Sequence, residues 1–391
     1  MTQSDHAYTF TWESALNDLD RTSWNALARP VESPFLEWEW LELMESSGSI
    51  SPETGWYPTH LAVWSQNTLV AAAPLYQKIH SEGEFIDDYI WADLAYRMGV
   101  AYYPKLVGMS PVTPVQGYRF LISPREDTAY LTGLMLAEIE RYCRSNQLSG
   151  YHFLYADMTW VNALPGNPSI PWLHPVLIWK NPGYADFDDY LSRFKTNQRR
   201  NIIRERRRAG QQGITLRPLT GDQLTEEHLE LMYRYYVGTN SKFGSWGCRY
   251  LTRDFFIRLA GRFRERLMLM GAFAENAPEE PVAMGMFVYK GDRLYGRYWG
   301  CREEVDTLHF NTCYYSPIEW AINGGIREFD PGIGGGHKVR RGFESVAGCS
   351  LHRFLDPEME TIMRMNIDAI NGQARDYIGK INQRIPFAAR D

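Results

Sequence analysis

The chain contains two apolar runs that indicate its fold class, Leu269-Met-Gly-Ala-Phe-Ala274 and Pro281-Val-Ala-Met-Gly-Met-Phe-Val-Tyr-Lys290. Runs of this length, rich in branched and aromatic residues and joined by a polar turn, predict two adjacent strands. An earlier stretch repeats the pattern, with His60-Leu-Ala-Val-Trp64, the turn Ser65-Gln-Asn67 and the run from Leu69 to Lys78. The sequence therefore predicts two similar β-hairpins.

Each predicted hairpin is followed by the same kind of segment. A helical stretch from Thr128 to Asn146 ends before Gly150 and a strand at 151–156, and Cys313 to Asn323 ends before Gly325 and a strand at 326–330. Glycine commonly closes a helix before a strand. The shared order favours a duplicated domain of mixed α/β class, although any two hairpins share some of this pattern.

Length and composition limit the architecture. A chain of 391 residues suggests two or three domains. Its 44% hydrophobic and 23% charged residues exclude extended disorder, and its 14% aromatic share favours sheets over a helical bundle. Five prolines between 162 and 183 argue against a continuous helix or central strand there. We therefore expect domains at 1–180 and 181–355, with a helical tail at 356–391 packed on one of them.

Charge is concentrated in one segment. The formal net charge of −6 excludes binding of nucleic acid by bulk charge. However, residues 193–208 hold eight basic residues and one acid, Glu205, and the remaining chain has 33 basic against 46 acidic residues, a net charge of −13. Thr196 is expected to cap a helix through this segment, with Ile202 and Ile203 on one face.

Several site classes have no support in the sequence. The five cysteines are widely spaced, without a Cys-x-x-Cys pair, so neither a metal site nor a disulfide framework is predicted. The first residues lack a secretion-signal pattern, and the longest apolar run is far shorter than the ~20 residues of a membrane span. We expect a cytoplasmic protein with no membrane span. The oligomeric state is left open.

Three stretches carry a resemblance to a known family: Phe194 to Gly213, Tyr103-Pro-Lys-Leu106 with Ser110 to Arg119, and Phe329 to Phe343. Together they resemble the FemAB-like acyltransferases of the GNAT superfamily, and within them a bacterial subfamily of predicted N-acyltransferases. The resemblance runs from about Trp12 to His352. It implies two tandem GNAT-like domains of α/β (α+β) class, each a mixed sheet flanked by helices, and an enzyme that transfers acyl groups to amines.

A glycine-rich loop is the first candidate site. In Gly332-Ile-Gly-Gly-Gly-His-Lys338 the backbone N–H groups of Gly334, Gly335 and Gly336 could converge on an anion. His337 is the candidate general base because imidazole titrates near neutrality. Lys338 is a candidate for stabilising the oxyanion, and Arg340 and Arg341 for holding phosphate or carboxylate. The alternative is a tight turn with solvated charges.

Further candidate side chains surround the second predicted hairpin. His309 and Asn311 are candidates for proton transfer or carbonyl polarisation, Tyr298 and Tyr315 for protonating the leaving group, and Trp299 for an aromatic wall. In the first half, Asp87 and Asp88 are candidates for receiving the acceptor amine. Packing under a sheet, or simple solvation for the carboxylates, is the alternative for each.

The resemblance implies an aminoacyl-tRNA donor rather than acyl-CoA, because FemAB-type enzymes take aminoacyl groups from charged tRNA, and no tightly bound cofactor is expected. CoA-dependent GNAT enzymes hold pyrophosphate in a glycine-rich loop, but the corresponding segments, Ser123 to Thr128 and Arg302 to Thr307, are acidic and lack glycine. Phosphates of a tRNA or another carrier would bind the basic segment through Arg199, Arg200, Arg204 and Arg207. Alternatively, that segment pairs with acidic parts of the chain.

The acceptor is expected to be an amino group of a small molecule, a peptide or a cell-wall precursor. Two other functions are compatible with the same residues. One is a non-catalytic GNAT-fold protein that binds nucleic acid or cell-wall precursors, and the other is an acyl-CoA-dependent N-acetyltransferase with a divergent loop. A catalytic protein requires a proton-transfer group in its site, whereas a binding protein requires only charge and aromatic surface.

Overall fold

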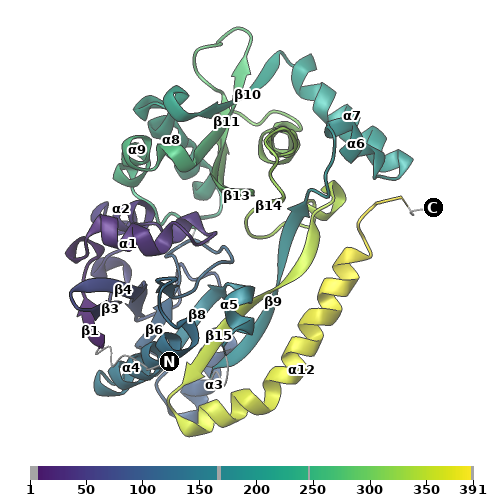
Figure 1. Ribbon diagram of the computed structural model, residues 1–391. Helices are drawn as coiled ribbons and strands as arrows, with labels where there is room; N and C mark the ends of the chain where they lie inside the picture. Colours follow the sequence, from purple (N-terminus) through teal and green to yellow (C-terminus); the bar gives the residue numbers. More distant parts are fainter. Residues whose placement is uncertain (1–7, 165–168, 245–246, 389–391) are drawn as a thin grey trace. The chain divides into compact units, whose positions relative to one another are not determined.

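A computed structural model describes residues 8–164, 169–244 and 247–388 (Figure 1). The chain forms two compact units. Unit 1 comprises Met1–His174 with Ala347–Arg375, and unit 2 comprises Pro175–Val346 with Asp376–Asp391. Strands and helices occur in both, and helices pack on the sheets, which confirms the expected α/β class.

Unit 1 contains an antiparallel sheet in the order β1 (Tyr8–Glu13), β3 (His60–Ser65), β4 (Thr68–Ala73) and β7 (Leu121–Ile122). A second group has the order β8 (Gly150–Ala156), β6 (Lys105–Gly108), β5 (Leu75–Lys78) and β2 (Trp56–Pro58), with β8 parallel to β6. The helices are α1 (Arg21–Ala28), α2 (Trp38–Ser46), α3 (Tyr89–Met98), α4 (Thr128–Ser145) and α5 (Met158–Asn162). Of these, α1 packs on β4 and α4 packs on β8.

The first predicted hairpin is present, with one difference. The run from Leu69 to Lys78 is divided between β4 and β5 at Pro74, which has no backbone N–H to donate to a ladder. The turn before it places Gln66 and Asn67 at φ +47° and +66°, as in the tight turns that join twisted antiparallel strands.

The first helices of unit 2 are α6 (Phe187–Ser192) and α7 (Thr196–Gln211). Its antiparallel strands are ordered β10 (Ile214–Thr220), β11 (Leu267–Ala274), β12 (Ala283–Lys290) and β13 (Arg293–Cys301). Helices α8 (Glu226–Ser241) and α9 (Arg253–Arg262) follow β10. After β13 come α10 (Leu308–Phe310), a π-helical turn (Asn311–Tyr315), α11 (Ser316–Asn323) and β14 (Glu328–Asp330), which is parallel to β13.

Both units therefore show the predicted order of strand, turn, strand, helix, strand. In each, the helix connects two parallel strands, α4 between β6 and β8 and α11 between β13 and β14. Such a connection needs a crossover because parallel strands cannot be joined by a tight turn. That the two halves superpose as duplicated domains stays a prediction.

The prediction that residues 162–183 contain no central strand is wrong. β9 (Ile170–Lys180) runs through Pro171 and Pro175, while Pro165 and Pro168 lie outside the described residues. Both prolines of β9 are exposed, and its ladder with β14 uses only Trp179 and Lys180. Neither proline is therefore required to donate to that ladder.

The unit limits also differ from the expected 1–180, 181–355 and 356–391. Unit 1 ends its first segment at His174 and includes residues 347–355, because β15 (Glu344–Phe354) pairs with β8. The tail helix α12 (Pro357–Asn382) begins in unit 1, where Met359, Met363 and Ile367 pack with Trp91 and Phe354, and ends in unit 2.

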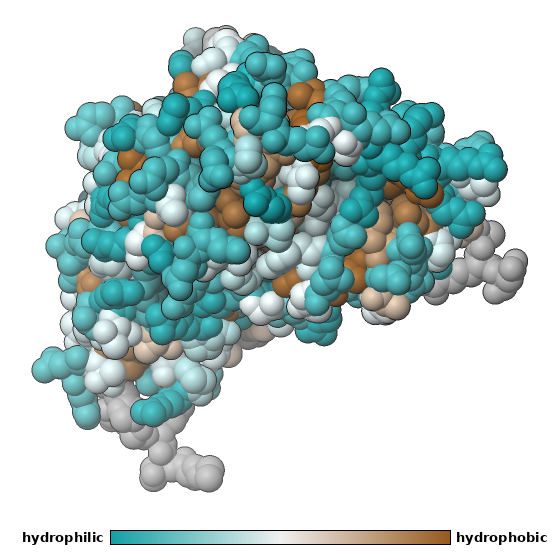
Figure 2. Space-filling view, turned by 90° about the horizontal axis from the view of Figure 1, so that it is seen from above, coloured by the Kyte–Doolittle hydropathy of each residue, from teal (hydrophilic) through white to brown (hydrophobic). Residues whose placement is uncertain are grey.

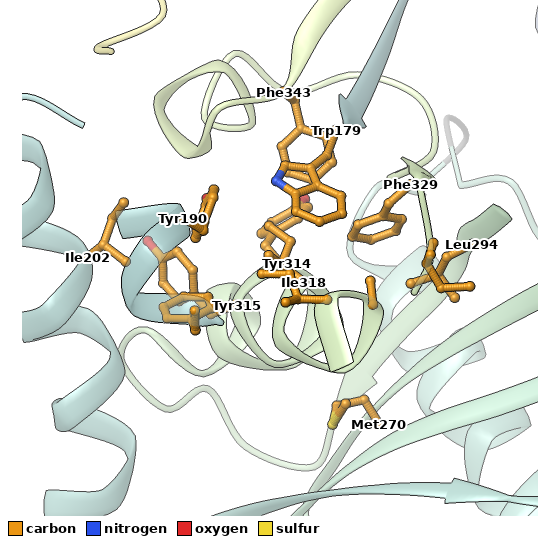
Figure 3. Close-up of a cluster of buried hydrophobic side chains, with 14 of the residues drawn as sticks. Trp179, Tyr190, Ile202, Met270, Leu294, Tyr314, Tyr315, Ile318, Phe329 and Phe343 are labelled. Carbon is orange, nitrogen blue, oxygen red and sulfur yellow. The ribbon is translucent and has the colours of Figure 1, made fainter. Parts of the chain in front are cut away.

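The core of unit 2 lies beneath the glycine-rich loop. Trp179, Tyr314, Ile318, Phe329 and Phe343 gather from β9, the π-helical turn, α11, β14 and the end of the loop (Figure 3). Each is at most 4% exposed, and burying an aliphatic or aromatic side chain of this kind contributes about 1.5–3 kcal/mol. The core thereby anchors both sides of the loop that contains His337.

The surface visible in Figure 2 is mostly hydrophilic, with apolar residues in small groups between polar ones. Among the residues that the structure describes, no helix is both long and apolar enough to cross a membrane.

Candidate active site

His337 lies in the loop that follows β14. Glycines at positions 332, 334 and 335 have φ of +81°, +77° and +88°, values that residues with a Cβ rarely adopt. A Cβ on Gly335 would lie 2.4 Å from Cε1 of His337. The glycines are thus needed for the backbone path and for close packing of the imidazole against it.

The imidazole of His337 is paired with Tyr314 from the π-helical turn. The distance between Nε2 of His337 and the Tyr314 hydroxyl is 2.9 Å, and the His309 ring centroid lies 5.7 Å from that of His337. Burial, together with the charges of Lys338 and Arg341, lowers the pKa of His337. A neutral imidazole at pH 7 can accept a proton, as a general base must.

The two groups next to the His337 imidazole, His309 and Tyr314, are uncharged at neutral pH as well. Burial, followed by the charge of His337, lowers the pKa of His309 to about 4, and Trp299 contacts its ring at a centroid distance of 5.1 Å. Burial raises the pKa of the Tyr314 hydroxyl well above its ordinary value, so this group keeps its proton. Within the cluster of His337, Tyr314, His309 and Trp299, the His337 imidazole is therefore the group that can accept a proton near pH 7.

Lys338 holds the loop rather than facing solvent. Its side chain is buried, and its Nζ donates to the carbonyl oxygens of Gly332 and Ile333 at 2.7 and 3.0 Å. Burial lowers its pKa to about 8 despite the opposing effect of Asp330. Since two of its three protons are used within the loop, Lys338 stabilises the fold of this segment more directly than an incoming anion.

Arg341 is also turned inward, whereas Arg340 is exposed. The Arg341 guanidinium is 3.5 Å from the centroid of the Phe310 ring and pairs with Glu205 of α7 at 2.6 Å. Tyr315 donates its hydroxyl to the same carboxylate, and Asn311 donates Nδ2 to the carbonyl oxygen of Glu205 at 3.0 Å. Arg341, Tyr315 and Asn311 therefore connect α7 to the His337 loop, a role that differs from those predicted for them.

The basic segment forms α7, as predicted, although Lys195 rather than Thr196 occupies the N-cap position. Thr196 has already entered the helix, and no side chain caps it. Arg206 pairs with Glu319 and Arg208 with Asp306, in partial agreement with the alternative of pairing to acidic residues. Arg200, Arg204 and Arg207 are exposed and Arg199 half-buried, and within the described part of the chain no ion pair engages these four. They leave a cationic surface that suits phosphates.

Of three other predicted residues, Tyr298 lies differently, whereas the anion contact predicted for Gly334 and Gly336 stays a prediction. Tyr298 packs between Tyr236 and Phe256, with ring centroids 5.0 and 5.8 Å away, so its contacts are structural. Gly334 and Gly336 are exposed, without close neighbours.

In unit 1, Asp87 is exposed but Asp88 belongs to a buried cluster that the sequence did not predict. Lys105 Nζ contacts Asp88 Oδ2 at 2.7 Å, Glu84 Oε2 at 2.8 Å and Ser81 Oγ at 2.8 Å. Burial raises the pKa of Asp88, but the ammonium of Lys105 outweighs it and the net pKa is lowered. A carboxylate with these partners is satisfied internally rather than available to an amine.

Comparisons with known proteins identify the family of the chain. A sequence model of the FemAB-like family, described as peptidoglycan biosynthesis/recognition, matches residues 15–389. The chain belongs to the FemAB-like family. Membership makes this FemAB-like chain a transferase, as predicted, whereas its donor and acceptor are matters of proposal.

Solved structures agree at the level of fold. FemX is 13% identical, covers 88% of this chain and 98% of its own, and has a TM-score of 0.51. L-PGS from Bacillus licheniformis is 10% identical, covers 91% of this chain and 98% of its own, and has a TM-score of 0.50. The C-terminal domain of an Agrobacterium fabrum protein described as a putative lysylphosphatidylglycerol synthetase is 7% identical, covers 89% of this chain and 95% of its own, and has a TM-score of 0.54. A comparison with curated proteins gave no match.

Sequence reasoning grouped Tyr314 with Tyr315 near the candidate residues but gave no site role to Tyr314 or Glu205. Glu205 carried a signal, because it is the only acid among eight basic residues of its segment. A single acidic residue in such a segment indicates that its carboxylate points into the protein and pairs with a buried basic group. Tyr314 had a weaker signal, its position between the predicted candidates Asn311 and Tyr315.

Proposed function

We propose that this FemAB-like protein transfers an aminoacyl or other acyl group from a phosphate-bearing carrier to the amino group of a small molecule, peptide or cell-wall precursor. The observation that carries the proposal is the half-buried His337, hydrogen-bonded to Tyr314 in a unit that also exposes the cationic surface of α7. A proton acceptor and a carrier-binding surface are two of the requirements of acyl transfer.

In the proposed reaction the acceptor nitrogen attacks the carbonyl carbon of the carrier ester, so that a C–N bond forms and the C–O bond breaks. We assign the hydrogen of the neutral imidazole to His337 Nε2, 2.9 Å from the Tyr314 hydroxyl, so that Nδ1 accepts the proton released by the attacking amine. The imidazolium then gives this proton to the leaving oxygen of the carrier. Protons balance, and no further reactant is required.

Aminoacyl-tRNA is the favoured carrier. In a CoA-dependent enzyme, pyrophosphate would bind at a helix N-terminus. Here the N-terminus of α4 is occupied by Asp127, whose carboxylate accepts from the N–H of Tyr130. Before α10, Asp306 pairs with Arg208 and Glu304 with Lys242. Carboxylates in both places disfavour pyrophosphate, while the arginines of α7 suit the backbone of a polynucleotide.

Transfer from radiolabelled aminoacyl-tRNA to amine acceptors tests the proposal. His337→Ala is expected to lower turnover by about 10² or more while tRNA affinity stays nearly unchanged, because the imidazole moves a proton and does not hold phosphate. Unchanged turnover in His337→Ala would remove the catalytic assignment. Tight tRNA binding without transfer to any acceptor would favour the binding-protein alternative.

A further inference from the structure

We propose that Glu205 is a positioning residue: through Arg341 it holds the main chain of His337 where the imidazole can accept a proton. This inference rests on the proposed function, since it assigns a second role to the basic helix α7. One face of α7 offers cations to a carrier, and the opposite side fastens the proton-transfer loop.

Glu205 is attached to the site by both its side chain and its main chain. Its carboxylate accepts from the Arg341 guanidinium at 2.6 Å and from the Tyr315 hydroxyl. Its carbonyl oxygen accepts from Asn311 Nδ2 at 3.0 Å and from Thr307 Oγ1 at 3.1 Å. Four donors, from the loop at Arg341, the π-helical turn and the residue before α10, thus converge on one residue of α7.

Arg341 transmits this attachment to His337. While one guanidinium nitrogen binds Glu205, another donates to the carbonyl oxygen of His337 at 2.9 Å. The Arg341 side chain is 4% exposed, and Tyr190 donates its hydroxyl to the Arg341 carbonyl at 2.7 Å. A buried guanidinium in contact with a carboxylate, a carbonyl and an aromatic ring has little freedom to move, so His337 is held at its main chain by Arg341 and at its ring by Tyr314.

The charge of Glu205 is also required. Arg341 and Lys338 both lower the pKa of His337, and the carboxylate of Glu205 pairs with the Arg341 guanidinium. The other titratable groups around His337 are His309 and Tyr314, with Asp330 beyond Lys338. Without Glu205 the Arg341 charge would be uncompensated, which would disfavour the imidazolium that forms during transfer.

The test compares Glu205→Gln with Glu319→Gln. Glutamine keeps the shape of the side chain and an acceptor oxygen for Arg341 and Tyr315, which both donate to Oε2, but it has no negative charge, so the hydrogen bond from the guanidinium is weakened. Glu319 also pairs with an arginine of α7, Arg206, and in the described part of the chain it forms no ion pair with the His337 loop. It therefore provides the same charge change next to the same helix. Tyr315→Phe, which removes one partner of Glu205, serves as a second variant if Glu205→Gln does not fold.

Two readouts are measured: titration of the His337 imidazole by NMR of ¹³C-labelled histidine, and kcat and KM for transfer from aminoacyl-tRNA. We expect Glu205→Gln to lower the pKa of His337 and to reduce kcat by about 10-fold or more with KM for tRNA unchanged, since small misplacements of a reacting group have effects of this size. Tyr315→Phe is expected to lower kcat less, and Glu319→Gln to resemble the wild type in both readouts.

The inference is overturned if His337 titrates identically in Glu205→Gln and the wild type, or if Glu319→Gln shifts it equally. The titration requires no substrate. A shift confined to Glu205→Gln in a protein that shows no transfer would refute the proposed function while supporting the positional link. Normal transfer by Glu205→Gln, together with an inactive His337→Ala, would refute the link while supporting the function.

Discussion

The buried cluster around Lys105 in unit 1 leads to a quantitative prediction for Lys105→Met. The lysine side chain is 2% exposed, and those of its partners Glu84 and Asp88 are 0% and 6% exposed. Methionine has a similar length and fills most of the same space, so the change removes the ammonium that contacts both buried carboxylates and leaves Lys78 as a cation that acts on Glu84. Removing one partner of a buried ion pair costs about 3–5 kcal/mol, and we expect a destabilisation in this range, although Asp88 keeps its hydrogen bonds from Ser81 and Tyr102.

The pH dependence gives an independent check. In the wild type the pKa of Asp88 is lowered on balance, so its contribution to stability is present above its unfolded pKa and is lost as pH falls through the folded pKa. In Lys105→Met the pKa of both carboxyls should rise, because burial remains while the attraction of the ammonium is removed. A carboxyl group whose pKa is raised by folding destabilises the folded state at neutral pH, where the group is ionised. It destabilises the folded state less at low pH, where the group is protonated. The stability difference between variant and wild type should therefore narrow as pH falls from 7 toward 4.

Urea denaturation of both proteins at several pH values measures this difference. Lys380→Met provides a matched control, since Lys380 is exposed on α12 and its replacement should change stability by less than about 0.5 kcal/mol. A Lys105→Met difference below about 1 kcal/mol at pH 7, or one that grows on acidification, would contradict the account of the cluster as a buried ion pair.

Two further predictions concern the carrier. Replacing both Arg200 and Arg207 with Ala should weaken tRNA binding and reduce the slope of log affinity against log salt concentration by about two units, one for each phosphate that is no longer neutralised. The double variant should still fold, because both side chains are exposed. Filter binding across a salt series measures the slope, and an unchanged slope would show that the carrier binds elsewhere. Calorimetry with coenzyme A and acetyl-CoA should show no low-micromolar binding, because Asp127 already occupies the N-terminus of α4; tight binding would instead support the acyl-CoA-dependent alternative.

Much of the local structure was predictable because its causes lie within a few residues. Hairpins, the helix at α4 and the basic helix α7 follow from periodicity, polar turns and glycine stops, and each is present close to its predicted bounds. The glycine-rich loop was recognised as a special backbone segment for the same reason, since positive φ favours glycine. Gly335 also makes room for the His337 ring, and the predicted contact of these glycines with an anion stays a prediction.

Side-chain direction could not be predicted in the same way. Lys338 and Arg341 were expected to face an anion, but both are buried, because carbonyls of the loop and the carboxylate of Glu205 offer them closer partners. Asp88 was expected to be available at the surface and is instead bound to Lys105, 17 residues later. In each case the competing partner becomes visible only after the chain has folded.

The sequence by itself determined the α/β class, the repeated order of elements, the cationic character of α7 and the position of His337 in a glycine-rich loop, since all of these arise from short-range patterns. Only the tertiary structure decided which of these charges face inward and which meet solvent. Glu205 and Arg341 are 136 residues apart in the chain, and Glu205 and Tyr315 are 110 apart. Contacts over such separations depend on how β14, the π-helical turn and α7 pack around a shared core, and this packing is a property of the whole unit rather than of any local stretch.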